Sequence, residues 1–586
     1  MPSSLSLLDF VHLLHQRQQN LLARLPETSP VALELQRIGP SLSLAQAALE
    51  KQALIERQAD LPLQIAVVGP TQAGKSSVVN WILKQEAAGV SPLAGYTIHP
   101  QAFLHDLHDP VVPWVDEYFK GYRRLDITDL PKDRYDCFGI RRVESSSALP
   151  SCIVWDTPDF DSLRARQYLE GVLRTAALAD VSILVVSKDK YADQSVWDLL
   201  TLIEPLAQPT LVCLNKLRPS NRETLLKSWQ EKWDQVRQDG SPPVVTLAYY
   251  EHLEDLQGAS DQLHETLASP LRRALKARRR QGQRTRTLMR RHWPAWTRPV
   301  RAELAAEQSW QEMINGALGQ ALEIYRHDYL DHPLAYETFQ RALAELLTLL
   351  EIPGLARPMM LFRKAVTWPV KALFKRRPGR GGENIQELLI LRRSVEHALL
   401  QLQAALREQA HSDGLMEHWW QELSRHYQAA QPALNTLFEE EASAYYRAFQ
   451  PQVEAAAQSL YQRLKEMPAT LNSLRAARAT ADAAGLALLF QTGGIGPHDF
   501  VLAPAVLSMT SLMAESALGK YMDRVSADLK RTQLEAVKRL LQNRLRREIA
   551  SVAEQVDPAI RFRIPEETLA QVEAQLKEKS YGLKLF

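Results

Sequence analysis

The pattern of apolar and polar positions changes twice along the chain. Residues 4–58 carry a helical period twice, broken around LPETSP and IGPS, which predicts helices near 4–24 and 41–58 and a further helix between them. Between residue 64 and about residue 250, short apolar runs alternate with longer amphipathic stretches. Beyond that point the strand pattern is absent, and Leu, Ala, Glu, Gln and Arg follow long helical periods. We therefore expect N-terminal helices over 1–60, an α/β domain over 61–270 and an α-helical domain over 271–586.

The alternation in the middle part is typical of a mostly parallel, doubly wound sheet with helices on both faces. The helical part that follows predicts a long bundle, stalk or coiled coil that ends in a helical stretch over 515–556. We expect strands at 64–69, 152–156, 181–187, 210–215 and 244–248, with helices such as 193–207 and 221–238 between them.

Composition limits the class of protein. The 586 residues, 45% of them hydrophobic, suffice for two or three domains with their own cores. Lys and Arg number 70 against 68 Asp and Glu, so the overall charge does not indicate a polyanionic partner, and we do not expect nucleic acid. The three cysteines predict buried free thiols and a cytoplasmic location. No apolar run reaches the length of a membrane-spanning helix.

A phosphate-binding loop follows the first predicted strand. Residues 69–76, GPTQAGKS, have the spacing G-x-x-x-x-G-K-S between a strand and a helix. Gly69 and Gly74 allow the backbone to curl so that its N–H groups point inward, and Lys75 can reach the outer phosphates of a nucleotide. Ser76 is then a ligand for Mg²⁺. The alternative is a glycine turn that only joins strand to helix.

A carboxylate for the metal follows the strand at 152–156. Asp156 ends this strand at the edge of the sheet where doubly wound folds bind ligands, so we assign it to Mg²⁺. The alternative is an Asp that caps a helix. Thr97 lies between the loop and this acid in sequence and is a candidate metal ligand, with Ser91 as its competitor.

The strand at 210–215 leads into a candidate base pocket. Asn215 and Lys216 follow each other at its carboxyl end, where Asn can bond a purine edge and the Lys stem can pack along the ring. This arrangement favours guanine over adenine.

The stretches LPLQIAVVGPTQAGKSSVVNW, DTPD and NK together resemble the GTPase domain of dynamin-like proteins, in the translation-factor-related class of P-loop GTPases. The resemblance covers roughly residues 61–250. It implies GTP as ligand and substrate, Mg²⁺ as cofactor, and self-association through the GTPase or the helical domain, with an extra cation contributed by a second subunit. By resemblance, Lys75 has a phosphate role, Ser76 and Asp156 have metal roles, Thr97 has a switch role and Asn215 has a base role. The residue that orients the attacking water does not carry over from the family, and Gln72 is our own candidate for it. We therefore expect the catalytic residues Lys75, Gln72 and Thr97, the metal ligands Ser76, Thr97 and Asp156, and the nucleotide-binding residues Gly69, Gln72, Ala73, Gly74, Lys75, Ser76, Ser77, Asp156, Asn215 and Lys216.

Three positions depart from the family pattern. Asp159 stands where a glycine is usual, which adds negative charge close to the expected γ-phosphate. Arg218 replaces the aspartate that accepts hydrogen bonds from guanine. Thr71 and Gln72 stand where Gln and Ser are usual. Two alternative functions therefore stay open: a nucleotide-binding scaffold with weak or no hydrolysis, and an ATP-dependent or nucleic-acid-associated P-loop protein.

Three further segments suggest partners. Residues 352–382 contain eight basic residues, no acid and several aromatics, which fits contact with an anionic membrane surface or a packed connection within the bundle. Residues 483–514, with Asp499 as their only formal charge, fit a membrane hairpin or a buried helical hairpin. Residues 272–291 carry ten basic residues and no acid, which indicates a solvated linking helix, with nucleic-acid binding as the rival. The protein is thus expected to be cytoplasmic, with peripheral contact at the inner face of a membrane.

Overall fold

The structure is a computed structural model. It describes residues 5–578 except 59, 91–96, 108–112, 145–148, 161–164, 218–221, 237–239, 249–255, 333–335, 351–385, 413 and 477–518. The chain forms two compact units. The first contains Met1–Leu304 and Pro558–Phe586, and the second contains Ala305–Asp557. We call them the GTPase-type unit and the helical unit.

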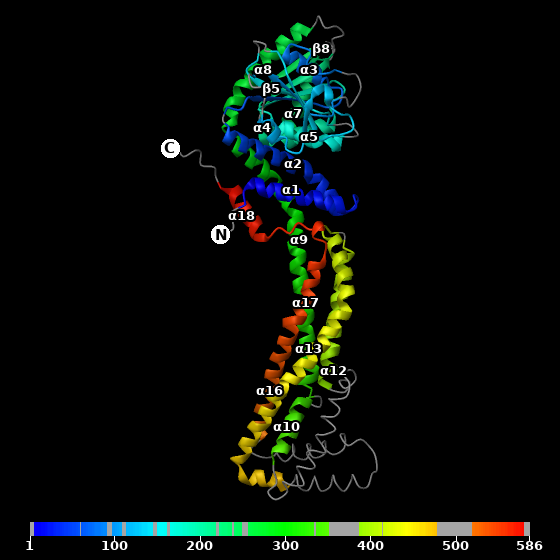
Figure 1. The fold of residues 1–586 in the computed structure, drawn as a ribbon, viewed down its shortest axis with the longest axis vertical. Coiled ribbons are helices and arrows are strands. Elements are labelled where there is room, and N and C mark those ends of the chain that lie inside the picture. Colours follow the sequence, from blue (N-terminus) through cyan, green and yellow to red (C-terminus); the bar gives the residue numbers. More distant parts are fainter. Residues whose placement is uncertain are drawn as a thin grey trace, which may run out of the picture. The chain divides into compact units, whose positions relative to one another are not determined.

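Eight strands of the described chain form one sheet in the GTPase-type unit, in the order β3-β4-β2-β5-β1-β6-β7-β8 (Figure 1). Neighbouring strands are parallel except β2 and β5, which are antiparallel. Strand β1 lies between β5 and β6, so the residues after these three strands meet at one edge of the sheet. The strands are β1 (Leu63–Val68), β2 (Gln101–His105), β3 (Arg123–Asp126), β4 (Cys137–Arg142), β5 (Cys152–Asp156), β6 (Val181–Ser187), β7 (Thr210–Leu217) and β8 (Val244–Ala248).

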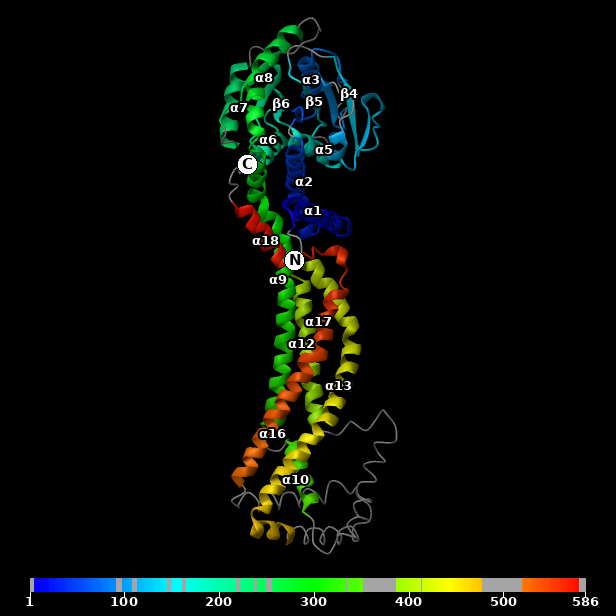
Figure 2. The same ribbon diagram turned by 60° about the vertical axis from the view of Figure 1, so that its left-hand side comes forward.

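Helices cover both faces of this sheet. On one face lie α3 and α8 (Figure 2). Their apolar side chains pack with Ile65 and Val67 of β1. On the other face, α5 contacts β1 and packs against α2. The helices of this unit are α1 (Leu7–Arg24), α2 (Pro30–Arg57), α3 (Lys75–Leu83), α4 (Pro113–Tyr118), α5 (Ala165–Leu178), α6 (Gln194–Ile203), α7 (Arg222–Val236), α8 (Leu256–Arg278) and the first part of α9 (Gln281–Tyr325).

The fold class is the one that the apolar pattern predicts, but two local predictions were wrong. The break predicted around IGPS is absent: the predicted middle helix and the helix predicted near 41–58 are one helix, α2, which begins at Pro30 and passes through Pro40. Its burial against α1 and α5 explains why the missing amide of Pro40 does not end it. The strands β2, β3 and β4 were not predicted, because β3 and β4 contain charged residues and β2 begins and ends with a polar residue, so none of them is a continuous apolar run.

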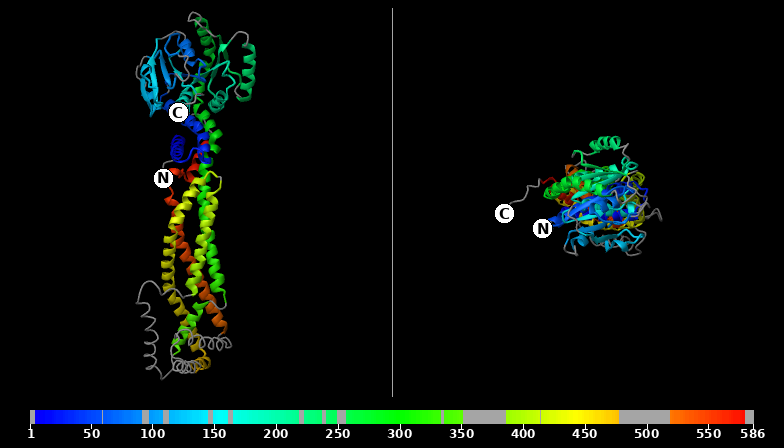
Figure 3. Two further views of the ribbon diagram at one scale, coloured as in Figure 1. Left: turned by 90° about the vertical axis from the view of Figure 1, so that its right-hand side faces the viewer. Right: turned by 90° about the horizontal axis from the view of Figure 1, so that it is seen from above.

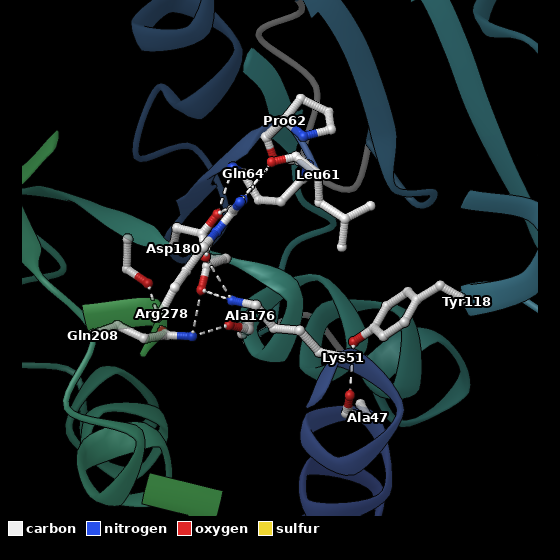
Figure 4. A network of polar contacts seen from close by, with 12 residues as sticks. Ala47, Lys51, Leu61, Pro62, Gln64, Tyr118, Ala176, Asp180, Gln208 and Arg278 are labelled. Atoms are coloured by element: carbon white, nitrogen blue, oxygen red, sulfur yellow. Dashed lines mark hydrogen bonds and ion pairs between the residues drawn. The ribbon is translucent and has the colours of Figure 1, made fainter. Parts of the chain in front are cut away.

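A network of buried charges lies at the amino ends of β1 and β6, opposite the edge that carries the glycine loop (Figure 4). The Asp180 carboxylate, which precedes β6, pairs with Lys51 of α2 at 3.0 Å and with Arg278 of α8 at 2.6 Å. It also accepts a hydrogen bond from the backbone N–H of Gln64 at 2.9 Å. Burial raises the pKa of Asp180, but the two cations and these hydrogen bonds outweigh it and hold the pKa below its ordinary value. We call Lys51, Asp180 and Arg278 the basal network.

The helical unit is built from helices that run side by side (Figure 3). Long helix α13 packs against α12, α10 and α16. The buried Glu387 carboxylate links its own helix, α12, to three others, because it accepts hydrogen bonds from Tyr325 of α9, Tyr445 of α13 and Gln533 of α16 at 3.0, 2.7 and 2.7 Å. The elements are the rest of α9, a π-helix (Arg326–Leu330), α10 (Glu337–Leu349), α12 (Gln386–Ala410), α13 (Glu417–Lys465), α16 (Gly519–Leu540), a second π-helix (Leu541–Leu545) and α17 (Arg546–Ser551).

The two units divide at positions other than the expected domain boundaries. The division falls between Leu304 and Ala305, inside α9, and not near residue 270. Residues from Pro558 onward, including α18 (Glu566–Lys577), belong to the GTPase-type unit. Glu303 explains this return, because its carboxylate accepts hydrogen bonds from the backbone N–H groups of Phe562 and Arg563 at 2.7 and 2.9 Å. Such a long-range contact has no local sequence signal.

The predicted partner segments are only partly within the described residues. Residues 352–382 and 483–514, as well as Ser91, lie outside them. The run at 272–291 spans the end of α8 and the start of α9, and Arg278 within it is a member of the basal network rather than a solvated side chain. In the described residues every helix is too short or too polar to span a bilayer. Cys137, Cys152 and Cys213 are buried free thiols, as predicted.

Candidate nucleotide site

The glycine loop connects β1 to α3, and two of its glycines are required by close neighbours. A Cβ atom on Gly69 would lie 2.3 Å from the carbonyl oxygen of Val185, a backbone atom of β6. Gly74 has a φ of 94° and precedes the first residue of α3, Lys75. A Cβ atom there would meet Nδ2 of Asn215 at 2.4 Å, so both its conformation and its surroundings demand glycine. The loop therefore has the tight path that a phosphate cradle needs.

Ser76 and Asp156 meet at the sheet edge. The Ser76 hydroxyl, in the first turn of α3, donates a 2.6 Å hydrogen bond to Oδ2 of Asp156 at the end of β5. Asp156 is fully buried, and its other oxygen, Oδ1, has no hydrogen-bond partner among the described residues. Burial raises the pKa of Asp156 to about 6, and Lys75 and the Ser76 hydroxyl oppose this rise. The pair thus presents an unsatisfied carboxylate oxygen next to a hydroxyl.

This pair fits a magnesium ion. Mg²⁺ prefers oxygen ligands and is commonly held by one or two protein oxygens together with substrate phosphates and water. The described residues hold no cluster of three His, Cys, Asp or Glu side chains, so an all-protein metal cage is not part of this region. Ser76 and Asp156 would hold the ion, and the orphaned Oδ1 supplies the remaining acceptor.

Lys75 already has an anionic partner. Its ammonium group donates to a carboxylate oxygen of Asp159 and lies 3.4 Å from the carbonyl oxygen of Pro70 within the loop. Both charged side chains are buried. Asp159 follows β5 by three residues, in the segment DTPD, and thus approaches the loop from the same side as Asp156. We call Lys75 and Asp159 the loop pair.

The end of β7 holds the loop from the other side. The buried Asn215 donates from Nδ2 to the carbonyl oxygen of Ala73 at 2.9 Å, and Lys216 donates from Nζ to the carbonyl oxygen of Gln72 at 2.7 Å. Asn215 Oδ1 also accepts from the backbone N–H of Lys216 at 2.9 Å. These bonds connect the candidate base pocket directly to the phosphate loop. The loop follows β1, and β7 is separated from β1 only by β6, so the end of β7 lies within reach of the loop.

The structure thus brings together most of the predicted site residues. Gly69, Ala73, Gly74, Lys75, Ser76 and Ser77 lie in or next to the loop, with Asp156, Asn215 and Lys216 around it. Gln72 is exposed at the turn of the loop with a φ of 61°. Thr97 is buried, and within the described residues no hydrogen bond joins it to Ser76 or Asp156. The roles of Gln72 and Thr97 stay predictions, and Arg218 lies outside the described residues.

The role of Asp159 as the partner of Lys75 was missed. The sequence showed only that an acid replaces a glycine, and the two residues are 84 positions apart. The motif DTPD after a strand was the available signal, because it places the acid at the same sheet edge as the loop.

The matched family model agrees with this geometry. Residues 64–216 match the model described as a 50S ribosome-binding GTPase, a range that begins in β1 and ends at Lys216. Residues 64–216 are a GTPase domain. The prediction of a P-loop GTPase domain is thereby confirmed, and the unit that contains it is from here on the GTPase unit.

Two curated relatives share this domain. GTPase Der of Sulfurimonas denitrificans is 25% identical over 190 residues, which are 32% of this chain and 31% of that protein. The tRNA modification GTPase MnmE of a Bradyrhizobium species is 31% identical over 137 residues, which are 23% of this chain and 29% of that protein. The chain thus spans less than a third of the length of either relative.

Similar solved structures include two described as an oligomerised bacterial dynamin pair with a mechanism for long-range sensing and tethering of membranes. Each is 12% identical, with 97% of this chain and 95% of that chain covered, at TM-scores of 0.39 and 0.40.

Proposed function

We propose that this protein is a magnesium-dependent GTPase of the dynamin-like type, in which the nucleotide state controls a long helical unit. The observation that carries the proposal is the contact between Ser76 and Asp156 at 2.6 Å beside a phosphate loop, with Asp156 Oδ1 buried and unpartnered. This is the arrangement that a nucleotide-bound Mg²⁺ needs. The dynamin-like part rests on the DTPD and NK motifs and on a GTPase unit followed by a helical one.

The chain's own groups would act by position and charge. The loop amides and Lys75 would bind and orient the triphosphate, since phosphoryl transfer depends mainly on alignment and on neutralisation of negative charge. Ser76 and Asp156 would hold the metal, and Asn215 would keep the loop in its bound conformation through Ala73. When bound, Mg²⁺ supplies charge stabilisation on the phosphate oxygens.

Hydrolysis is tested by phosphate release from GTP with Mg²⁺. We expect activity in the wild-type protein and a loss of at least about 100-fold in Ser76→Ala, because removal of a metal ligand takes away charge stabilisation that acts on the transition state. Lys84→Ala is the matched control, because Lys84 lies at the exposed end of the same helix and pairs with Asp261. Wild-type protein with no more activity than Ser76→Ala would remove the enzyme proposal.

Guanine preference is supported by the GTPase family match and by the position of Asn215 and Lys216 beside the loop. Calorimetric titration with GTP and with ATP tests it. We expect GTP to bind more tightly, and tighter ATP binding would favour the ATP-dependent alternative.

Membrane association and self-association are proposed from sequence. Residues 352–382 carry eight basic residues without an acid, and each contributes about 1 kcal/mol near an anionic surface. Vesicles that contain anionic lipid should sediment the wild-type protein and leave behind a variant neutralised over 363–377. Equal sedimentation of the two would exclude this segment as the contact. Light scattering with and without GTP tests self-association.

A further inference from the structure

We propose that Asp159 is an internal competitor of the nucleotide: its carboxylate occupies the anion position on Lys75 in the free protein, and the terminal phosphates of GTP must displace it. The inference rests on the proposed function, because it assigns a regulatory role within the same site. It explains why an acid can stand where the family has glycine without disrupting the loop.

The contacts of Lys75 support this role. An ammonium group that closes over a phosphate loop is placed to contact phosphate oxygens, and here the same group donates to Asp159 instead. A carboxylate and a terminal phosphate are both anions that accept hydrogen bonds from ammonium, so they compete for one donor group. Because both side chains are buried, the attraction is weakly screened by solvent.

The charge balance of the site points the same way. Asp156 and Asp159 both approach the loop, and the negative charge of Asp159 acts on Asp156. If Asp159 stayed in place, GTP would add a highly charged tail next to two carboxylates and share a single Lys75 with them. Movement of Asp159 away from Lys75 relieves this repulsion and frees the donor. The free protein is therefore held in a form that binds nucleotide less well, and the apparent affinity falls by the fraction of molecules that are competent.

The position of Asp159 makes the effect specific for the length of the phosphate chain. Its carboxylate pairs with Lys75, and the lysine of a phosphate loop reaches the β- and γ-phosphates, of which GTP has both and GDP only the first. Removal of its charge should therefore favour GTP more than GDP. A residue that only stabilised the fold would change both affinities alike.

The experiment compares Asp159→Asn and Asp159→Gly with the wild-type protein by calorimetric titration of GTP and GDP with Mg²⁺. We expect both variants to bind GTP at least about tenfold more tightly, with a smaller gain for GDP. Asp198→Asn is the matched control, because it removes the same charge from an exposed acid of α6 that accepts a hydrogen bond from Gln194 on the same helix. Circular dichroism verifies that the variants are folded.

The outcomes separate the two proposals. Wild-type protein that binds GTP, with variants of equal or weaker affinity, would overturn the competitor role and leave the proposed function intact. Absence of GTP binding in the wild-type protein and in both folded variants would overturn both. If Asp159→Asn does not fold, Asp159→Gly decides, because glycine is the usual residue of the family at this position. If neither variant folds, Asp159 is a structural residue and the competitor role is wrong.

Discussion

The GTPase unit contains two buried Lys–Asp pairs at opposite edges of one sheet, and they differ in the elements that supply the charged groups. In the basal network, the Asp180 carboxylate forms ion pairs with Lys51 and Arg278 and accepts a hydrogen bond from the backbone N–H of Gln64 (Figure 4). Lys51 also donates a hydrogen bond to the carbonyl oxygen of Ala179 at 2.7 Å. In the loop pair, Lys75 has Asp159 and one long contact to Pro70.

This difference indicates in which of the two ion pairs a ligand can displace the carboxylate. Every partner of Asp180 comes from a helix or strand that is fixed by packing, so exchange would leave several buried charges unpaired. Among the described residues Lys75 has one anionic partner, Asp159, which lies in a loop, and a phosphate can replace this carboxylate as the anion paired with Lys75. The same residue types therefore stabilise the fold at one edge and are proposed to regulate a site at the other.

The largest expected effect is on the basal network. Asp180→Asn leaves the buried Lys51 and the partly buried Arg278 without their anion, which should lower the free energy of unfolding of the GTPase unit by about 3–5 kcal/mol. Urea unfolding measures this. Glu117→Gln is the control, because its pair with Arg57 is exposed and should contribute less than about 1 kcal/mol. Similar losses in both variants would contradict the distinction between a saturated and an exposed pair.

A substitution in the loop pair should change the affinity for GTP. Lys75→Ala removes the ammonium group that both Asp159 and the phosphates use, so we expect GTP affinity to fall by at least about 100-fold, or about 2.7 kcal/mol. Asp180→Asn should bind GTP within about threefold of the wild-type protein, because the basal network lies at the far edge of the sheet. Titration calorimetry of both variants tests the comparison, and comparable affinity losses would show that the two edges are coupled.

The basal network also predicts a pH dependence. Because the pKa of Asp180 is held below its ordinary value of 3.8, the unfolded state binds the proton more readily than the folded state, and stability falls as pH decreases. The contribution is complete above pH 3.8 and is lost as pH falls through the lower folded value. The gap in unfolding free energy between wild type and Asp180→Asn should therefore be constant near neutral pH and narrow below about pH 4. A gap that persists unchanged in acid would contradict the assignment.

The smallest effect on the unfolding free energy is expected for Ser182, which lies beside the basal network. The buried Ser182 hydroxyl donates to Oε1 of Gln208 at 2.9 Å, and Gln208 in turn donates to the carbonyl oxygen of Ala179. Ser182→Ala should cost about 1 kcal/mol in unfolding free energy, because one neutral hydrogen bond is lost. Thr287→Ala, which removes an exposed hydroxyl on α9, should change it by less than about 0.5 kcal/mol. A larger loss for Ser182→Ala than for Asp180→Asn would contradict the ranking.

Much of the site was predictable because its signals are local. The phosphate loop follows the apolar strand β1, Asp156 ends the apolar strand β5, and Asn215 lies near the end of the apolar strand β7. Parallel strands bring their carboxyl ends together, so these residues were expected at one edge of the sheet. The strands β2, β3 and β4 were missed because they lack a continuous apolar run; β3, for example, is four residues long and mostly exposed. The continuation of α2 through Pro40 was missed because packing, not propensity, maintains it.

The sequence by itself determined the class of the domain and the residues of the phosphate loop, because strand periodicity and glycine spacing act over a few neighbouring positions. The tertiary structure alone decided which acid meets which lysine. Lys51 pairs with Asp180 across more than a hundred residues of chain, and Lys75 pairs with Asp159, which is 84 positions away. Charge pairing depends on distance in space and on burial, and neither is encoded in the spacing of residues along the chain.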